Sequence, residues 1–436
     1  MQQEASSRRI ERRLTSLFPS LMLEDHAEEV GVVERNRKLQ MPPLVWSLVF
    51  GFATGESRSL ADFRRSYNST ADDTLCPSGF YQQLTPELAE YLSDLVERGF
   101  DEVTVPDTAS QEIDCFRDII SADGTILRLH ELLADDFQAR KEEQAGARLH
   151  LLHNITDQTI EDYTVTDEKA HDSTQFDTGP WLEDRLVLFD RAYLCYRRFA
   201  LIDENGGYFV TPLKDNANPV TTEELREWRG DAIPLEGEQI HDVTDDLYRQ
   251  YIDVEVKVEF ERRPYAGEQS EDSKRFRVVG VRDEDADDRD YELYITNLPR
   301  EEFLPEEVAT IYSCRWETEL LFRELKTQYE LDEFDTSKKH VVEILLYAAL
   351  LSLLVSRELL ALLTEHAAEG IVFPPERWAA TLRSHAQLLL YRLGDYLGYS
   401  PPPLLDRLLE EAQKVHQERQ ILQEELASVM QPTVEA

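Results

Sequence analysis

Four polar side chains in the segment 311–326, IYSCRWETELLFRELK, are of types and at spacings that could do chemistry. Tyr312, Arg315, Glu319 and Lys326 are separated by three, four and seven residues. If the segment is one helix, a rotation of about 100° per residue places all four within an arc of about 60°. One face would then present a carboxylate, two cations and a phenol. The alternative is a solvent-facing helix in which Arg315 and Glu319 form an ordinary i, i+4 ion pair.

A carboxylate on a helix needs partners to hold a divalent metal ion, because Mg²⁺ takes oxygen ligands and usually one or two protein carboxylates per ion. Asp190 closes the apolar run RLVLFD, and Asp123 lies in IISADGT, where we expect Gly124 and Thr125 to form a turn. Both aspartates are therefore expected at strand ends on the edge of a sheet, where exposed acids without a function also occur. Three further acids are weaker candidates: Asp107, Asp114 and Asp118.

Histidines and cysteines do not indicate a second metal site. His150 and His153 are three residues apart in a strand-like segment, which turns them to opposite faces. We expect these two, and the isolated His130 and His171, to be structural. The cysteines form no CxxC pair, so neither a disulfide framework nor structural zinc is indicated, and a reducing interior is expected; they are Cys76, Cys115, Cys195 and Cys314.

The periodicity of apolar residues divides the chain into four regions. Residues up to about 105 have helical spacing. Short strands follow from about 111 to 200, and then a strand and helix alternate, which predicts a mixed sheet with flanking helices. Between 205 and 300, VEVKVEF alternates like a half-buried strand and RFRVVGV and ELYITNL flank the acidic turn RDEDADDRD, which predicts an inserted β-rich subdomain. After 303 the pattern is helical, and three prolines at 401–403 precede a last charged helix.

The composition indicates a globular protein with an unusual charge. The 436 residues include 46 Lys and Arg against 87 Asp and Glu, a net charge of −41, and 42% are hydrophobic, which excludes a disordered chain. Only ten residues are Lys. An acidic, Lys-poor surface suits concentrated salt, where charges are screened over about 3 Å at 1 M, so we predict a halophilic cytoplasm. An ordinary acidic protein is the alternative.

Two segments bear on location and on partners. The longest apolar run, Ile344–Ser356, is too short to span a bilayer and suits a buried helix, and the first residues show no cleavage site for export. Residues 1–40 contain seven cations and seven acids, so this stretch is neutral within an acidic chain. It is a candidate nucleic-acid face, with a solvated helix of mixed charge as the alternative.

On these motifs the sequence resembles the DDE transposases of the Insertion-Sequence-Four family, whose signature is Tyr, Arg, Glu and Lys at this spacing. The resemblance runs from about 113 to 340 and includes ADGTILRL, LVLFDRAYLCYRRFALIDENGGYFV and RWETELLFRELK. It implies an α+β (mixed α/β) fold, a ribonuclease-H-like catalytic core with a β-rich insertion and flanking helical regions. It also implies a metal-binding triad of Asp123, Asp190 and Glu319. DNA phosphates near the cut would be held by the remaining signature residues, Tyr312, Arg315 and Lys326.

The resemblance also assigns roles to the four regions. A helical region at 1–105 would bind DNA ends, 111–204 with 301–340 would form the catalytic core, 205–300 would be the β-rich insertion, and 341–436 a C-terminal helical region. In related enzymes the insertion braces the DNA end, sometimes with an aromatic residue on a flipped base. Trp228 or a tyrosine of the insertion could do so here, although a core position is the alternative for each.

The implied reaction is transposition in the cytoplasm, at the nucleoid, of a halophilic archaeon. Two Mg²⁺ ions, or Mn²⁺ in their place, would support hydrolysis at the element's ends and attack of the freed 3′-hydroxyl on target DNA. The expected partners are double-stranded DNA of both kinds and a second copy of the chain, with no membrane. Two alternatives share the fold: a domesticated DNA-binding protein without catalysis, and a nuclease without strand transfer.

Overall fold

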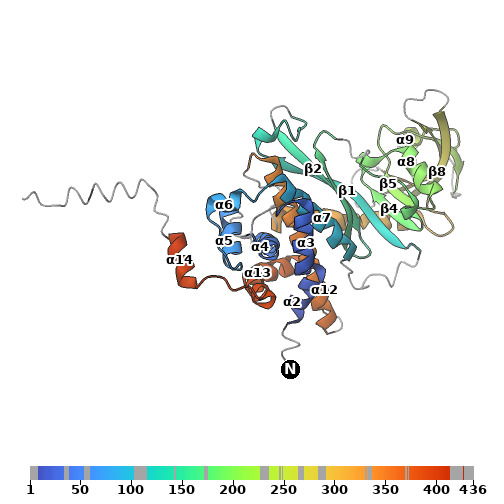
Figure 1. Ribbon diagram of the computed structural model, residues 1–436. Helices are drawn as coiled ribbons and strands as arrows, with labels where there is room; N and C mark the ends of the chain where they lie inside the picture. The colour runs from blue at the N-terminus through green and yellow to red at the C-terminus, as the bar shows by residue number, and fades with distance from the viewer. Residues whose placement is uncertain are drawn as a thin grey trace, which may run out of the picture. The chain divides into compact units, whose positions relative to one another are not determined.

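The computed structural model describes most of the chain and divides it into two compact units (Figure 1). Unit 1 comprises Met1–Tyr91 and Ala379–Ala436, and unit 2 comprises Leu92–Trp378. The described residues are 8–33, 39–53, 59–102, 115–141, 144–170, 175–225, 235–244, 247, 249–263, 270–282, 291–328, 331, 336–368, 371, 373–412 and 426. Several predictions of the sequence analysis lie outside these residues: Asp107, Asp114, His171, Trp228, residues 283–290 of the acidic turn, and most of the last helix after 412.

Unit 1 is helical where it is described, as the spacing predicts. Its helices are α2 (Arg9–Leu17), α3 (Ser20–Val30), α4 (Met41–Ala53), α5 (Leu60–Asn68), α6 (Pro77–Tyr81), the start of α7 (Pro86–Glu102), most of α13 (Pro375–Leu397) and α14 (Leu404–Ala412). Every residue of α4 is buried, which explains why this helix is apolar on all sides. Arg392 of α13 pairs at 2.7 Å with the buried Glu11 of α2, so the N-terminal and C-terminal segments of unit 1 meet at this ion pair.

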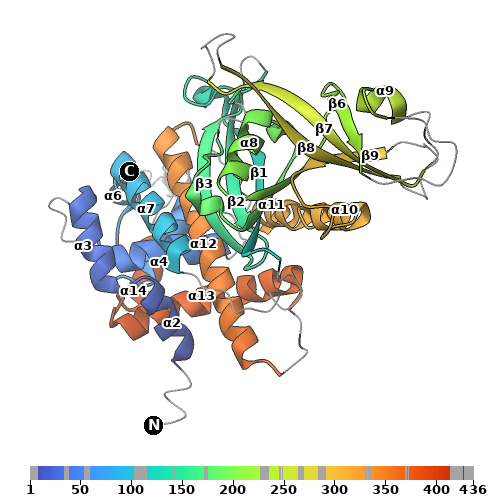
Figure 2. The same ribbon diagram turned by 90° about the vertical axis from the view of Figure 1, so that its right-hand side faces the viewer.

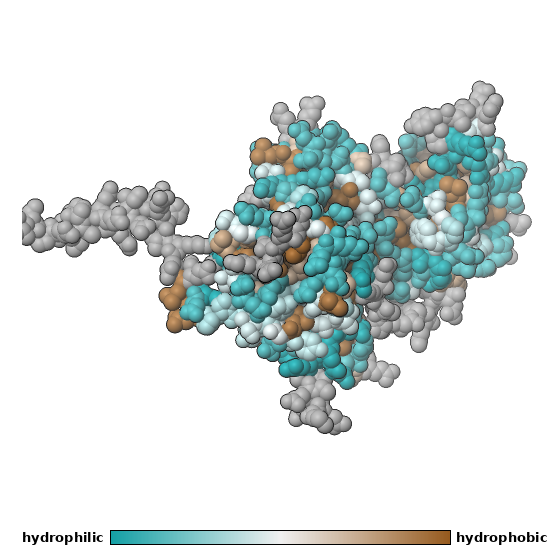
Figure 3. All heavy atoms as spheres, viewed as in Figure 1, coloured by the Kyte–Doolittle hydropathy of each residue, from teal (hydrophilic) through white to brown (hydrophobic). Residues whose placement is uncertain are grey.

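The short helix α14 carries an exposed apolar stripe. Its leucines are between 50% and 67% exposed, and hydrophobic colour gathers at this helix in Figure 3: Leu404, Leu405, Leu408 and Leu409. Hydrophilic residues cover most of the face of the molecule that Figure 3 shows, as expected for so acidic a chain.

Unit 2 is built on one mixed sheet in the order β3-β2-β1-β4-β5-β9-β8-β7-β6 (Figure 2). Strands β1, β4 and β5 are parallel, and the other neighbours are antiparallel. The strands are β1 (Asp118–Leu129), β2 (Ala145–Asn154), β3 (Thr159–Asp167), β4 (Arg185–Phe189), β5 (Tyr208–Pro212), β6 (Val220–Glu224), β7 (Tyr251–Glu261), β8 (Glu271–Arg282) and β9 (Tyr291–Thr296).

The β-rich stretch 205–300 continues this sheet. Strand β5, inside the stretch, pairs in parallel with β4, and β9 pairs with β5. The pairing of β8 with β7 and β9 agrees with the predicted alternation and hairpin. We therefore describe the insertion as an extension of the central sheet by β6 to β9, because their backbone groups complete the edge that β5 would otherwise leave open.

Helices cover the two faces of the sheet. Phe199 of α8 (Tyr196–Glu204) packs with Phe209 and Val187 on one face, and Val308 of α10 (Pro305–Ser313) packs with Leu186 and other residues on the opposite face. Short helices connect the strands: η1 (Glu131–Leu133), η3 (Pro180–Leu182), η4 (Arg191–Tyr193) and α9 (Ile240–Thr244). In Figure 2, α10 runs along the sheet beside β8 and β9, and α11 (Trp316–Gln328) follows it toward β1.

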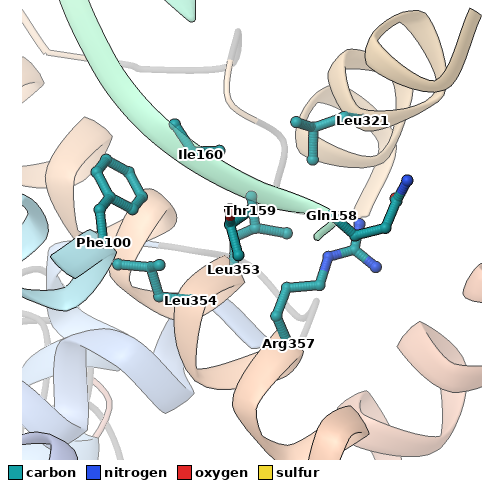
Figure 4. A pocket seen from close by; sticks show the side chains of 8 residues that line it. All are labelled: Phe100, Gln158, Thr159, Ile160, Leu321, Leu353, Leu354 and Arg357. Carbon is teal, nitrogen blue, oxygen red and sulfur yellow. The ribbon is translucent and has the colours of Figure 1, made fainter. Parts of the chain in front are cut away.

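The predicted buried helix is α12 (Lys339–His366), which contains Ile344–Ser356. Among the described residues it is the one helix whose length and composition would suffice to cross a membrane, yet 83% of its most apolar window is buried. Figure 4 shows Leu353 and Leu354 of α12 near Ile160 of β3, with Leu321 of α11 beyond them. The apolar run is therefore core packing, as the sequence predicts.

Candidate active site

Asp123 lies in the middle of β1, and the predicted turn at Gly124 and Thr125 is wrong. β1 pairs with β2 without interruption from Ile120 to Leu129, so the pairing keeps the backbone extended through Gly124. The parallel neighbour β4 does stop here, because its last pair joins Phe189 to Ala122. Asp123 is thus at the position where β4 ends.

Asp190 directly follows the last residue of β4, as predicted. Its carboxylate accepts a hydrogen bond of 3.2 Å from the backbone N–H of Ala192 and caps η4. In register, Asp190 is the neighbour of Asp123, since the preceding residues of the two strands are paired. Ile119 is four residues before Asp123, and Leu188 is two residues before Asp190, so each lies on the same face of its strand as the aspartate. Both apolar residues pack on the face covered by α10, and both carboxylates therefore belong to that face.

The signature segment is not one helix, contrary to the prediction. α10 ends at Ser313, and α11 begins at Trp316. Between them the backbone makes tight i to i+3 hydrogen bonds, from Arg315 N–H to the Tyr312 carbonyl and from Thr318 N–H to the Arg315 carbonyl, both 3.0 Å. Tyr312 therefore lies on α10, Arg315 in the turn and Glu319 on α11.

Arg315 joins the signature residues to the first aspartate. Its guanidinium donates to Asp123 Oδ2 at 2.7 Å and to Glu319 Oε1 at 2.6 Å, while its Nε donates to the Tyr312 hydroxyl at 3.0 Å. The side chains of Arg315 and Asp123 are only 16% and 13% exposed. Residues about 190 positions apart in the chain thus meet in one buried, charge-assisted network.

Burial controls the ionisation of this network. Burial raises the pKa of Asp123 to about 6, against the lowering effects of Arg315 and of the Gly124 N–H, and the charges of Asp190 and Glu319 raise it further. Burial likewise raises the pKa of Tyr312 to about 12, so this phenol keeps its proton at neutral pH. Asp123 and Glu319 share the guanidinium of Arg315, and Asp190 neighbours Asp123 in register, so the three carboxylates lie in one region of the structure.

Lys326 holds the later part of α11 on the sheet. Its ammonium group donates to the backbone carbonyl of Ile126 in β1 at 2.9 Å. Because Ile126 is three residues beyond Asp123 on the same strand, this bond fixes α11 along β1. Hydrogen bonds thus join four of the predicted residues, Tyr312, Arg315, Asp123 and Glu319. Lys326 is bonded to the same strand as Asp123, and Asp190 lies beside Asp123 by register.

Buried polar side chains of β2 and α12 hold α11 on the side that carries Thr318 and Glu324. His153 of β2 is 3.0 Å from the hydroxyl of Thr318, the residue before Glu319, and Arg357 of α12 pairs at 2.6 Å with Glu324. In Figure 4, Arg357 extends from α12 toward the β2–β3 turn at Gln158. The orientation of α11 is thus set on one side by this cluster and on the other by the network around Arg315.

His150 turns to the other face of β2 and contacts the hydroxyls of Tyr193 and Thr166. Both histidines have structural partners, as predicted.

Three residues near the site were missed by the sequence reasoning. Arg191 follows Asp190 directly, and Lys214 donates to the carbonyl of Ala192 at 3.5 Å, so two cations flank the Asp190 turn. Trp316 follows Arg315 and is 52% exposed, with the guanidinium of Arg323 over its ring. A large exposed aromatic next to a signature residue is the signal that could have identified Trp316.

Comparison with known proteins identifies the family. A sequence model described as the transposase DDE domain matches residues 114–355, more than half of the chain. The chain belongs to the DDE transposase family. The matched region contains Asp123, Asp190 and Glu319, and the fold is the mixed α+β arrangement, consistent with a ribonuclease-H-like core, that the sequence predicts.

Curated relatives include transposases of insertion sequences. The transposase for insertion sequence element IS231E of Bacillus thuringiensis subsp. finitimus is 22% identical over 380 residues, which are 77% of this chain and 76% of the relative. The transposase for IS231C of Bacillus thuringiensis subsp. berliner is also 22% identical, over 78% of this chain and 77% of the relative. The transposase for IS231F of subsp. israelensis is 21% identical over similar shares.

DDE transposase domains generally use divalent metal ions, and the donor chemistry here fits such ions. Asp123, Asp190 and Glu319 offer only carboxylate oxygens, the ligands that Mg²⁺ and Mn²⁺ prefer. Within the part of the chain that the structure describes, no three acidic, histidine or cysteine side chains already form a metal-binding group. Arg315 binds oxygens of two of the three carboxylates.

Proposed function

We propose that this DDE transposase belongs to the Insertion-Sequence-Four family and moves an insertion sequence by cutting at its terminal inverted repeats and joining the freed 3′-hydroxyl to target DNA. The observation that carries the proposal is the hydrogen-bonded network in which Arg315 joins Asp123, Glu319 and Tyr312. This network lies next to the end of β4, which Asp190 follows. The names of the relatives, transposases for insertion sequence elements, support it.

Asp123, Asp190 and Glu319 would hold the metal in this proposal. Two bound divalent ions, either Mg²⁺ or Mn²⁺, would stabilise the attacking and the leaving oxygen of an in-line displacement. Arg315 offers two parallel N–H donors to phosphate oxygens, and the protonated Tyr312 hydroxyl offers a third donor beside it. Lys326 would add a cation on the same side of α11.

The remaining regions would serve the DNA. We propose that residues 1–105 bind the element's ends, that 111–204 with 301–340 form the core, that the insertion 205–300 braces the DNA, and that 341–436 complete the protein as a helical region. Two copies are needed to cut two ends together, so a homodimer on DNA follows from the proposed reaction.

The acidity of the chain is consistent with a halophilic cytoplasm, because counterion release contributes little to DNA binding in concentrated salt. Binding would then depend on direct contacts at places where the protein is locally neutral. At the proposed site, Arg315 is paired with Asp123 and Glu319, and the neighbouring Arg191 is paired with Asp215.

The test is cleavage of DNA carrying the element's own ends in multimolar KCl with Mg²⁺, using the natural protein, Glu319→Gln and Glu317→Gln. Glu317 is exposed and lies on another side of α11, which makes it a matched control. The proposal predicts cutting and joining by the natural protein and the control, and binding without cutting by Glu319→Gln. Equal cutting by all three would refute the role of Glu319. Binding without cutting by the natural protein would favour the domesticated DNA-binding protein, and cutting without joining would favour the nuclease.

A further inference from the structure

We propose that Arg315 is an internal counter-ion that keeps Asp123 and Glu319 paired until phosphate arrives, so that metal and DNA enter the site together. This inference rests on the proposed function, because it assumes that these carboxylates hold the metal. It adds a second role to Arg315, which acts on the carboxylates before it acts on DNA.

The first support is that the oxygens of Asp123 are already engaged. Oδ2 accepts from Arg315 at 2.7 Å, and Oδ1 accepts from the N–H of Gly124 at 2.7 Å. Glu319 Oε1 accepts from the other arm of the same guanidinium at 2.6 Å. A metal ion on Asp123 must therefore compete with a charge-assisted bond, and the side chain is too buried for water to compensate a weakening of that bond.

The second support is charge. A divalent cation between Asp123 and Glu319 would lie next to a guanidinium that cannot lose its proton, so the two positive groups compete for the same carboxylates. Tight metal binding consequently requires Arg315 to move away from the carboxylates.

The third support is that Arg315 and Tyr312 are held in different ways. Arg315 lies in the turn between α10 and α11, where the regular helical hydrogen bonds are interrupted. Tyr312 instead packs against Tyr294 with ring centroids 5.0 Å apart. A phosphate diester can accept the same two parallel N–H bonds from a guanidinium, so Arg315 exchanges two carboxylate oxygens for two phosphate oxygens.

The predicted consequence is reciprocal coupling. A phosphate-like anion at Arg315 raises the affinity for the metal, and the metal raises the affinity for the anion by the same factor. The site would then bind the metal weakly until a DNA phosphate occupies Arg315.

The experiment measures Mn²⁺ binding to the full chain from the loss of the free-ion signal in electron paramagnetic resonance. It compares the natural protein with Arg315→Gln, Arg315→Lys and the control Arg323→Gln, in KCl with and without sulfate as the phosphate mimic at constant ionic strength. Arg323 is exposed on the same helix and is paired with Trp316 rather than with the carboxylates. Asp190→Asn identifies which bound Mn²⁺ belongs to the site.

We expect Arg315→Gln to bind the Mn²⁺ that depends on Asp190 at least about ten-fold more tightly than the natural protein, and sulfate to tighten binding only in the natural protein. Arg315→Lys keeps the charge but cannot bridge both carboxylates, so its affinity should lie between the two, and Arg323→Gln should stay within about two-fold. If Asp190→Asn removes a bound ion but Arg315→Gln binds it no more tightly, the counter-ion role is refuted and the proposed function stands. If no bound ion depends on Asp190, the proposed metal site fails and the inference falls with it.

Discussion

Replacing Asp123 by Asn should make the metal-free protein more stable at neutral pH, because burial disfavours the charged form of this carboxylate. Its pKa is raised from 3.8 to about 6, mainly by burial, although Arg315 and the Gly124 N–H act in the opposite direction. Between about pH 4 and pH 6 the folded protein therefore retains a proton that the unfolded chain has already lost. An active-site acid held in this way lowers stability until a ligand compensates it.

The size and sign of the effect follow from the shift. Two pKa units correspond to about 3 kcal/mol, since one unit is about 1.4 kcal/mol. Because the pKa is raised in the folded state, the natural protein loses this amount as pH increases from about 4 to about 6, and the loss is constant above that range. Asn stays neutral throughout, so the variant should gain about half of the 3 kcal/mol at pH 5 and nearly all of it at pH 7.

Thermal unfolding in multimolar KCl without divalent ions, between pH 5 and 8, measures this difference. A domain of this size gains about 2 °C per kcal/mol, so Asp123→Asn should unfold about 6 °C higher at pH 7. Asp215→Asn is the control, because the Asp215 side chain is 92% exposed and should change stability by no more than about 0.5 kcal/mol. A variant that unfolds below the natural protein at pH 7 would refute the reasoning, since the bonds from Arg315 would then outweigh burial.

Three further variants test the packing that supports the site. Asp253→Asn should cost about 3–5 kcal/mol in thermal unfolding, because it removes the charge and one of the two acceptor oxygens that bind the buried Arg277 at 2.7 and 2.9 Å. His153→Asn should flatten the loss of stability in a pH titration below about 6.5, since burial lowers the pKa of His153 to about 3 and the unfolded chain binds the proton first. Gly207→Ala should lower the unfolding temperature by an amount equivalent to about 1–3 kcal/mol, because its Cβ would lie 2.8 Å from the carbonyl oxygen of Leu182.

Periodicity predicted the parts of the fold where one face of an element is buried. The alternation from Val254 to Phe260 is strand β7, and the apolar run Ile344–Ser356 is the buried helix α12. The prediction of a turn at Gly124 failed. Asp, Gly and Thr in sequence favour a turn when only local residues are considered, whereas pairing with β2 keeps this part of β1 extended. Local sequence could not show this, since the deciding hydrogen bonds come from residues more than twenty positions away.

The position of Asp190 at the end of its strand was predicted correctly. The ion pair of Arg315 and Glu319 also forms, which the sequence analysis had given as the alternative to a functional role. The spacing could not show that the helix breaks before Trp316, because both a continuous helix and a tight turn keep these residues close. It also could not show that Arg315 reaches Asp123, which depends on how α11 lies along the sheet.

The central claim, that strand-end carboxylates hold the metal for cutting and joining DNA, is tested most directly by changing one ligand to sulfur. Cleavage of the element's ends by Asp190→Cys should be compared with that of the natural protein in Mg²⁺ and in Mn²⁺, after thermal unfolding has shown that the variant is folded. Mg²⁺ requires oxygen ligands, whereas Mn²⁺ accepts sulfur more readily. We predict that Asp190→Cys is inactive with Mg²⁺ and regains part of its activity with Mn²⁺, while the natural protein is active with both. Cleavage by Asp190→Cys in Mg²⁺ at the natural rate would contradict the account.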